Sequence, residues 1–420
     1  MEKALLVTTE FFDNDYKDTW KLNDINFELK ELVKSAGISV VDLLECFKDR
    51  PTAAYYIGKG KAEEIGAIRA DKGANVVIFG NDLSSTQQQN LEDIVGVKVI
   101  DRTQLILDIF AHRAHSMEGK VQVELAQLQY LLPRLKGKGI MLSRLGGGIG
   151  TRGPGEQKLE MDRRRIRDKI AGLKDELKNI HLRREGLRRK RHESELTIIS
   201  LIGYTNAGKS TLLNALTHSD VIAEDRLFST LDPTARRFIL PNNQKVVFVD
   251  TVGFLHNLPH HLIEAFKATL EEVVEADILI HVLDASSPIV RELSDAVHEV
   301  LEELGASDKP VIIALNKIDK IEDKSEIERL KKDFDNAIPI SALNKENLEE
   351  LVERISMMLF ASLVYAKALI PQSEGKLLSQ IYKEASIIRK EFRPEGVYIE
   401  ADMAPRLKNI LDKKGFCDKL

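Results

Sequence analysis

The sequence predicts an α/β protein built around a P-loop nucleotide-binding domain, a mostly parallel sheet with helices on both faces. An apolar run at 196–202 leads into the pattern G-x-x-x-x-G-K-S at 203–210 and then into a helix opening. Two later apolar runs, 246–250 and 311–316, end in polar residues, as strands do when their carboxyl ends line a ligand site. The first 115 residues alternate short apolar runs with helical stretches, which is typical of a smaller α/β sheet.

The chain divides into four predicted parts. They are an N-terminal α/β subdomain (1–115), a long antiparallel helical hairpin (116–195), the nucleotide domain (196–365) and a small C-terminal α+β domain (366–420). In the first part we expect strands at 4–9, 39–44, 75–80 and 97–101 and helices at 61–72 and 84–94. In the last part we expect a helix at 376–389, a strand at 397–401 and a helix at 404–414.

Two apolar stripes predict the hairpin. The first has a 4,3,4,3 spacing from Val121 to Leu135, and the second recurs every seven residues within a helix expected over 157–190. Two such stripes joined by one loop pair most simply as an antiparallel coiled coil. The tip loop, 136–155, holds 8 of the chain's 25 glycines together with Arg144 and Arg152. Its composition fits a loop that orders on RNA, and it also fits a flexible connector.

Composition and charge narrow the function classes. The 420 residues carry a net charge of −5, yet residues 156–193 hold 14 lysines and arginines against 8 acidic residues. This asymmetry predicts a local RNA contact through the basic hairpin, with no role for DNA. No apolar run approaches the ~18 residues that span a bilayer. Cys46 and Cys417 match no metal or disulfide pattern, so we expect a cytoplasmic protein, and we expect it to be a monomer.

The turn at 203–210 has the local chemistry of a phosphate cradle. Its glycines let several backbone N–H groups point at phosphates, and the helix start adds its positive dipole end. Lys209 is predicted to reach the β- and γ-phosphates, and the Ser210 hydroxyl to ligate Mg²⁺. The predicted contacts here are Gly203, Tyr204, Thr205, Asn206, Ala207, Gly208, Lys209, Ser210 and Thr211.

The later motifs predict which nucleotide is bound. Asp250 ends a strand and suits Mg²⁺, directly or through water, while the Gly253 amide would meet a γ-phosphate. Asp319 can accept hydrogen bonds from the guanine N1–H and 2-amino group, which adenine lacks, and the Ala342 amide would face the guanine O6. The order of these motifs predicts GTP and GDP as ligands. The contacts predicted here are Asp250, Thr251, Val252, Gly253, Asn316, Lys317, Ile318, Asp319, Ser341, Ala342 and Leu343.

A loop between these motifs is a candidate first switch. Within it, Phe228, Ser229, Thr230, Leu231 and Asp232 are predicted nucleotide contacts, with Thr230 sensing the γ-phosphate and binding Mg²⁺. Thr234 is the alternative, and a surface loop without a nucleotide role is the third possibility. Lys209, Thr230 and Gly253 form the predicted catalytic set. Phe254 stands where Ras-type switches place a water-orienting glutamine, which predicts slow intrinsic hydrolysis.

Over nearly its whole length the chain resembles the HflX family of translational GTPases. The motifs that carry the resemblance are 56–61 (YIGKGK), 101–114 (DRTQLILDIFAHRA), 146–156 (GGGIGTRGPGE), 203–210 (GYTNAGKS) and 228–234 (FSTLDPT). The resemblance implies a cytoplasmic GTPase that binds the large ribosomal subunit and helps to separate stalled ribosomes. It also implies that the glycine-rich loop approaches the peptidyl-transferase region.

Two other functions compete with ribosome remodelling. The first is a GTP-gated RNA-binding factor in ribosome assembly, which does no mechanical work on mature ribosomes. The second is a signalling switch with a protein or membrane partner, which would show no salt-sensitive affinity for RNA. The charge of the tip loop argues against the second alternative.

Overall fold

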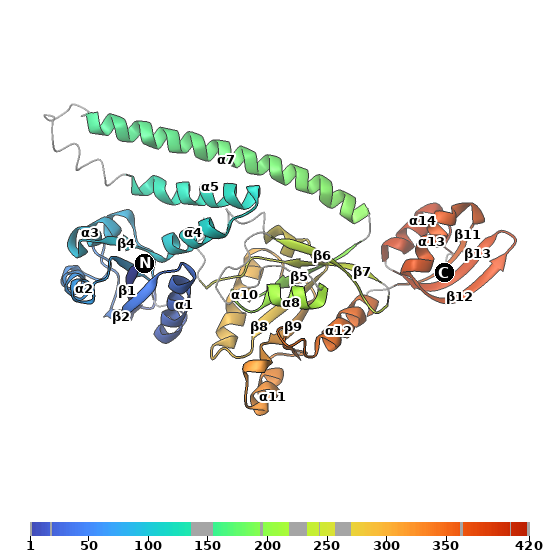
Figure 1. Cartoon of the computed structure of the whole chain (residues 1–420). Helices are drawn as coiled ribbons and strands as arrows, with labels where there is room; N and C mark the ends of the chain where they lie inside the picture. Colours follow the sequence, from blue (N-terminus) through green and yellow to red (C-terminus); the bar gives the residue numbers. More distant parts are fainter. Residues whose placement is uncertain are drawn as a thin grey trace.

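Three sheets organise the chain, and they follow one another from the N-terminus to the C-terminus (Figure 1). The computed structural model describes residues 2–16, 19–135, 154–193, 196–217, 233–242, 244–256, 270–361, 364–403 and 405–417. The first two sheets belong to units that share an apolar cluster, in which Leu29 and Phe110 of the N-terminal unit pack with Val252 and Leu255 of the central one. The predicted α/β class with a central P-loop domain is confirmed.

The N-terminal unit is a four-stranded parallel sheet in the order β2-β1-β3-β4. Its strands are β1 (Lys3–Phe11), β2 (Ser39–Lys48), β3 (Val76–Phe79) and β4 (Lys98–Ile100), and its helices are α1 (Leu22–Ser35), α2 (Lys59–Lys72), α3 (Ser85–Val95) and α4 (Arg102–Arg113). The four predicted strands and the helices α2 and α3 are present. Helices α1 and α4 were not predicted. In α1 the buried face includes the polar residues Asn26 and Glu28, so the sequence of this helix lacks a continuous apolar periodicity.

The predicted helical hairpin is present. Helix α5 (Met117–Arg134) runs antiparallel to α7 (Pro154–Glu193), and they pack through Val121, Leu125 and Leu173. At ~1.5 Å per residue, the 40 residues of α7 extend ~60 Å, so α7 continues past the base of α5 and over the central unit (Figure 1). None of the helices in the described ranges is both long and apolar enough to cross a membrane. The loop at 136–153 lies outside the described residues.

The central unit is a six-stranded sheet in the order β10-β9-β8-β5-β7-β6, parallel except for β6. Its strands are β5 (Thr197–Ile202), β6 (Thr234–Ile239), β7 (Lys245–Asp250), β8 (Ile278–Asp284), β9 (Val311–Asn316) and β10 (Ile338–Pro339). Its helices include α8 (Lys209–Thr217), α10 (Val290–Glu303), α11 (Lys324–Asp333) and α12 (Leu348–Ala361).

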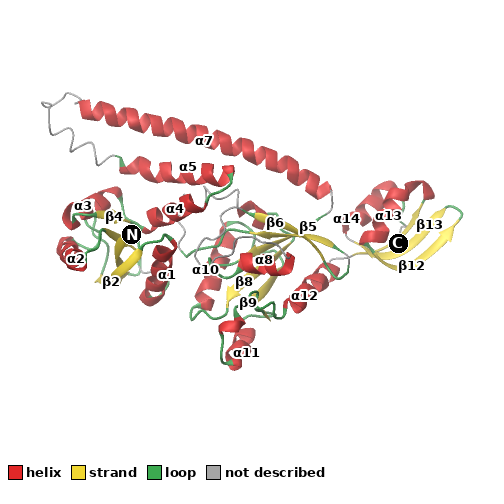
Figure 2. Cartoon of the chain, in the orientation of Figure 1, coloured by secondary structure: helices red, strands yellow, loops and turns green. Residues whose placement is uncertain are grey.

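Helices cover both faces of this sheet (Figure 2). Along β5, Ile199 and Leu201 enter one buried cluster while Ile198 and Ile202 enter another. A strand buried on both faces has no polar alternation, which explains its continuous apolar sequence. Because β5, β7 and β9 are parallel, the phosphate loop after β5 and the polar ends of β7 (Asp250) and β9 (Asn316) meet at one edge of the sheet.

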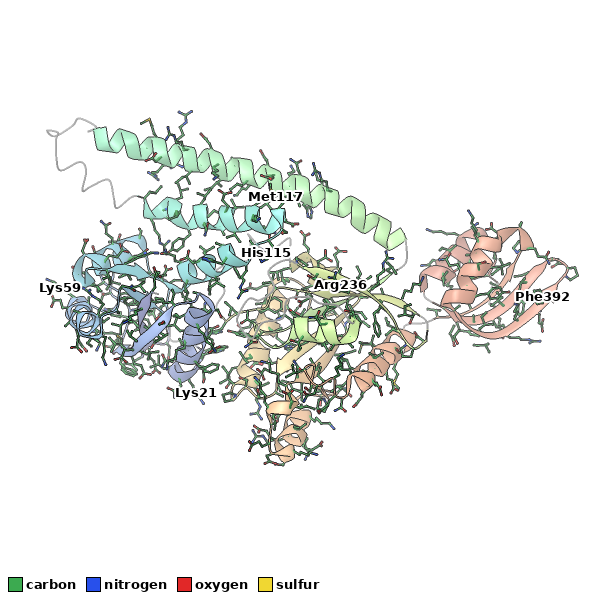
Figure 3. The ribbon with its side chains drawn as sticks, in the orientation of Figure 1. Lys21, Lys59, His115, Met117, Arg236 and Phe392 are labelled. Atoms are coloured by element: carbon green, nitrogen blue, oxygen red, sulfur yellow. The ribbon has the colours of Figure 1, made fainter. Side chains whose placement is uncertain are left out.

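The C-terminal unit requires a correction of the predicted elements. It is an antiparallel sheet in the order β11-β13-β12, formed by β11 (Val364–Ile370), β12 (Ser386–Arg393) and β13 (Gly396–Met403), with helices α13 (Gly375–Glu384) and α14 (Pro405–Lys414). The helix predicted at 376–389 ends at Glu384, because residues 386–393 pair with β13 as an edge strand. The sheet also begins at Val364, two residues before the predicted boundary. Phe392 projects from β12 (Figure 3) and is 74% exposed.

Candidate nucleotide site

The predicted phosphate loop joins β5 to α8, as its sequence required. Gly203 has φ +146°, and a Cβ there would lie 2.3 Å from the Val282 carbonyl oxygen. Gly208 has φ +96°, and a Cβ there would lie 2.2 Å from Asn316 Nδ2. Both positions therefore demand glycine, because the turn passes directly against β8 and the end of β9. The loop is pressed onto the carboxyl edge of the sheet.

Lys209 is folded back over this loop. Its ammonium group donates to the carbonyl oxygens of Gly203 at 3.0 Å and Tyr204 at 2.8 Å, and the residue is 6% exposed. Burial lowers the pKa of Lys209 to about 8, with the nearby Asp250 carboxylate opposing the shift. A buried ammonium group held among carbonyl oxygens is a suitable partner for phosphate oxygens.

Ser210 and Asp250 lie side by side. The Ser210 hydroxyl donates to Asp250 Oδ2 at 2.6 Å, and the Asp250 side chain is fully buried at the end of β7. Thr234, the alternative first-switch threonine, starts β6 directly opposite Asp250. A hydroxyl and a carboxylate in contact form a set of hard oxygen ligands that suits Mg²⁺. The preferred first-switch residues, Phe228 to Asp232 with Thr230, lie outside the described part of the chain.

The residues predicted to recognise the base also come together. Asn316 Nδ2 donates to the Ala207 carbonyl at 2.8 Å, and Asn316 Oδ1 accepts from the Ala342 amide at 2.9 Å. One buried side chain thus joins the phosphate loop to the 341–343 loop. The Ala342 amide, predicted to face the guanine O6, is engaged by Asn316 in this structure. Ser341 donates to Asp319 Oδ1 at 2.5 Å, which orients that carboxylate.

Segment 251–256 lies along the phosphate loop. The Phe254 amide donates to the Gly203 carbonyl at 3.1 Å, and the Phe254 carbonyl accepts from the Thr205 amide at 3.0 Å. A Cβ on Gly253 would lie 2.7 Å from Thr205 Cα and 3.0 Å from Lys209 Nζ, so only a glycine allows this approach. The Phe254 side chain is 3% exposed and packs in an apolar cluster of the sheet.

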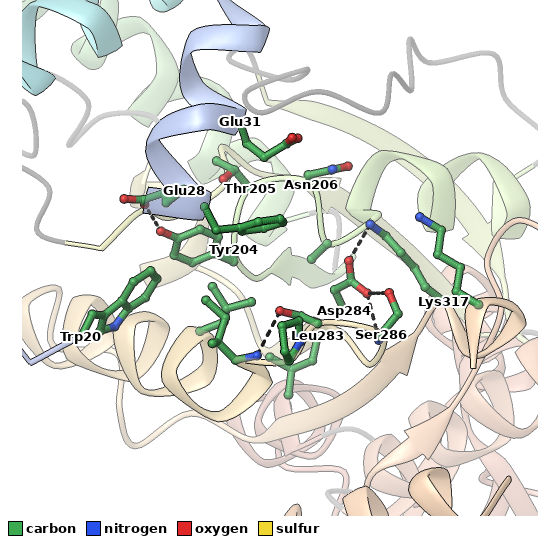
Figure 4. Close-up of a pocket in the computed structure, with 17 residues that line it drawn as sticks. Trp20, Glu28, Glu31, Tyr204, Thr205, Asn206, Leu283, Asp284, Ser286 and Lys317 are labelled. Atoms are coloured by element: carbon green, nitrogen blue, oxygen red, sulfur yellow. Dashed lines mark hydrogen bonds and ion pairs between the residues drawn. The ribbon is translucent and has the colours of Figure 1, made fainter. Parts of the chain in front are cut away.

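A cavity of about 270 Å³ adjoins the phosphate loop (Figure 4). It lies between the loop residues 204–207, the turn after β8 and helix α1. Asp284, which ends β8, forms an ion pair with Lys317 at 2.7 Å. Sequence reasoning missed Asp284, although a carboxylate at the end of an apolar strand was an available signal. Lys317, a predicted nucleotide contact, has φ +66°. Leu343, another predicted contact, is 71% exposed.

Three protein families match consecutive parts of the chain. Residues 24–111 match the family described as GTP-binding GTPase N-terminal, and residues 113–191 match the GTP-binding GTPase middle region. Residues 198–317 match the family described as 50S ribosome-binding GTPase. The three matches follow the N-terminal sheet, the hairpin and the nucleotide-binding sheet in order.

Curated relatives match nearly the whole chain. GTPase HflX of Caldanaerobacter subterraneus subsp. tengcongensis is 47% identical over 384 residues, which cover 91% of this chain and 88% of the relative. GTPase HflX of Escherichia coli is 42% identical over 397 residues, covering 94% and 92%. Among solved structures, a GTP-binding protein from Sulfolobus solfataricus in complex with GDP is 28% identical, covers 85% of this chain and 98% of its own, and has a TM-score of 0.45.

Proposed function

Because the chain belongs to the HflX family of GTPases, we propose that it associates with the large (50S) ribosomal subunit and uses GTP hydrolysis to split or remodel stalled ribosomes. The enzymatic activity, GTP hydrolysis, follows from family membership. The ribosome as partner is supported by the match of residues 198–317 to ribosome-binding GTPases. With such a partner, we propose that the protein acts in the cytoplasm.

The helical hairpin is the observation that carries this proposal. Helix α7 is a 40-residue arm rich in lysine and arginine, in a chain whose net charge is −5. The side chains of Arg165 and Arg167 on α7 are 81% and 50% exposed. Each arginine forms an ion pair on the same helix, with Asp162 and Glu160 respectively, and exposed guanidinium groups of this kind can also contact the closely spaced phosphates of folded RNA. Arg144 and Arg152, also predicted to contact rRNA, lie outside the described residues.

The proposed nucleotide chemistry assigns a role to Lys209, Ser210, Asp250 and Gly253. Lys209 would bind the β- and γ-phosphates, Ser210 would ligate Mg²⁺, and Asp250 would hold the ion through water. Mg²⁺ supplies positive charge that offsets the charge developing on the phosphates. The Gly253 amide, held against the phosphate loop, would donate to the γ-phosphate.

The packing of Phe254 supports slow hydrolysis by the isolated protein. Its ring is buried in an apolar cluster, and a phenyl ring has no group that hydrogen-bonds an attacking water. We infer that a partner supplies the group that orients this water, and the large subunit is the proposed source.

The test is single-turnover GTP hydrolysis by the protein alone and with large subunits, small subunits or intact ribosomes. We expect acceleration by large subunits and intact ribosomes. Changing Arg144 and Arg152 together to alanine should reduce the acceleration and leave GTP affinity unchanged. The matched control changes Lys331 and Lys332 of α11 to alanine, which removes the same charge far from the hairpin. Equal rates with and without large subunits would refute the proposal.

A second assay separates remodelling from ribosome assembly. Intact ribosomes are incubated with the protein and GTP, and the subunits are resolved on a sucrose gradient. Release of subunits supports splitting. Binding of large-subunit precursors without any release from mature ribosomes would instead favour a GTP-gated assembly factor.

A further inference from the structure

A buried polar cluster joins the N-terminal unit to the nucleotide site. It consists of Trp20, Glu28 and Arg102 from the N-terminal unit, Tyr204 from the phosphate loop, and His256, three residues after Gly253. We call these five residues the interdomain cluster. Figure 4 shows the Glu28 carboxylate reaching the Tyr204 hydroxyl from α1, with Trp20 nearby.

Each polar contact of the cluster converges on His256 or on Glu28. The Arg102 guanidinium donates to the Glu28 carboxylate oxygens at 3.1 and 3.0 Å and to the His256 carbonyl at 2.6 Å. The Tyr204 hydroxyl donates to Glu28 and accepts from the His256 amide at 2.9 Å. The Trp20 indole stacks on the His256 ring with centroids 4.2 Å apart and planes 7° apart. Both main-chain groups of His256 are therefore held, and so is its ring.

The cluster is buried, and a hydrogen bond in a low-dielectric interior is electrostatically stronger than one in water. Its members are between 5% and 8% exposed. Burial and the adjacent Glu28 carboxylate raise the pKa of Tyr204 well above its ordinary value, so its phenol keeps the proton that it donates. A buried Arg–Glu pair contributes little net stability because desolvation offsets its attraction. We infer that this pair instead fixes the relative positions of α1, the start of α4 and the segments that contain Tyr204 and His256.

The contacts of His256 help to fix the backbone on the C-terminal side of Gly253. On one side of this glycine, the Thr251 hydroxyl donates to the Leu201 carbonyl at 2.6 Å. On the other side, Phe254 pairs with the phosphate loop and His256 is held by the cluster. We propose that Arg102 and Glu28 are positioning residues, which hold segment 254–256 so that the Gly253 amide is already aimed at the γ-phosphate of bound GTP.

The same stretch of chain also anchors the helical hairpin. Asp101, next to Arg102, is fully buried and accepts from Tyr130 at 2.8 Å and from Arg134 at 2.8 Å, both on α5. Two adjacent residues thus contact the hairpin base and the segment after Gly253. This arrangement gives a structural role to Asp101 and Arg102, the first two residues of the motif at 101–114, which lies outside the predicted nucleotide contacts.

The inference rests on the proposed nucleotide site and not on the ribosome, so its test uses the purified full-length protein alone. Binding of GDP and of the non-hydrolysable analogue GMPPNP is measured by calorimetry in Mg²⁺. Trp20 is the only tryptophan of the chain, so quenching of its fluorescence by acrylamide reports whether the cluster is closed. The variants are Arg102→Ala, Arg102→Lys and the double variant Glu28→Leu/Arg102→Leu, which leaves no buried charge unpaired.

In Arg102→Ala we expect stronger Trp20 quenching, about tenfold weaker GMPPNP binding and GDP binding within about twofold of wild type, because only the γ-phosphate contact loses its support. Arg102→Lys should recover part of the GMPPNP affinity. If Arg102→Ala does not fold, the double variant carries the same expectation. The control, Arg291→Ala, removes an exposed arginine paired with Asp333 and should behave as wild type.

Three outcomes would overturn the inference. The first is stronger Trp20 quenching with an unchanged ratio of GMPPNP to GDP affinity. The second is an equal loss of affinity for both nucleotides, which would indicate general damage to the site. The third is Trp20 quenching that stays at the wild-type level, which would show that the cluster closes without Arg102. Failure of wild-type protein to bind either nucleotide would instead contradict the nucleotide site itself.

Discussion

Replacing Asn316 by alanine tests whether one side chain holds the nucleotide site together. Asn316 is 2% exposed and joins the Ala207 carbonyl of the phosphate loop to the Ala342 amide of the 341–343 loop, at 2.8 and 2.9 Å. In Asn316→Ala both buried groups lose this partner. The two loops can then relax apart to reach water, and nucleotide binding has to bring them together again.

The expected magnitude follows from these two contacts. Leaving a buried polar group unpaired costs about 1–3 kcal/mol. Two such groups, partly relieved by relaxation, amount to about 2–4 kcal/mol, which corresponds to GDP affinity about 30- to 1,000-fold weaker than wild type. The loss should appear as a faster dissociation rate, since most affinity changes within one site affect dissociation.

The assay is stopped-flow binding and release of a fluorescent GDP analogue in Mg²⁺, with thermal unfolding measured in parallel. Asn242→Ala is the matched control, because Asn242 is an exposed turn residue whose side chain pairs with the nearby Gln244. A variant whose GDP affinity stays within about threefold of wild type, while its unfolding free energy falls by about 2 kcal/mol or more, would refute the reasoning. Asn316 would then be a packing residue without influence on binding.

Three further predictions concern Asp319, the proposed contact of the guanine base, and two buried basic residues, Lys209 and His281. Asp319→Asn exchanges an acceptor for a donor, so affinity for xanthine nucleotides should rise relative to guanine nucleotides by about tenfold or more; unchanged selectivity in competition binding would show that Asp319 does not contact the base. Burial lowers the pKa of Lys209 to about 8, and bound phosphates would keep this residue protonated. GDP affinity should therefore be flat below pH 7 and about fourfold weaker at pH 8.5; a flat calorimetric profile would contradict this. Burial lowers the pKa of His281 to about 3, below its unfolded value of about 6.5, so unfolding free energy should be full above pH 6.5 and fall by about 1.4 kcal/mol per pH unit between pH 6 and 4. Urea titrations of His281→Leu should lack this component, and an identical slope in both proteins would exclude His281 as its source.

Much of the nucleotide site was predictable because its chemistry is local. The phosphate loop needs a strand, a glycine turn and a helix start in one short stretch, and the structure forms them where the sequence placed them. The polar ends of β7 and β9 were predictable for a related reason, since parallel strands bring their carboxyl ends to one edge. The pairing of α5 with α7 likewise followed from a periodicity that the sequence displays.

Some elements were not predicted because tertiary contacts, and not the local sequence, decide their conformation. Residues 386–389 were predicted as the last turn of a helix, yet they pair with β13 as part of the edge strand β12. In α1, Glu28 interrupts the apolar stripe because its carboxylate is buried against Arg102 and Tyr204. Tertiary pairing overrides local preference at both places.

The sequence by itself thus determined the type of site: a P-loop with residues suited to guanine, in a GTPase of the HflX family. Only the tertiary structure decided how the N-terminal unit meets that site. The contact between Tyr204 and Glu28 joins residues 176 positions apart, and that between Arg102 and His256 joins residues 154 apart. A local motif can be recognised from the sequence because the spacing of its residues along the chain is enough to identify it. A contact between distant segments depends on how whole sheets and helices pack, so it cannot be predicted from the residue spacing within either segment.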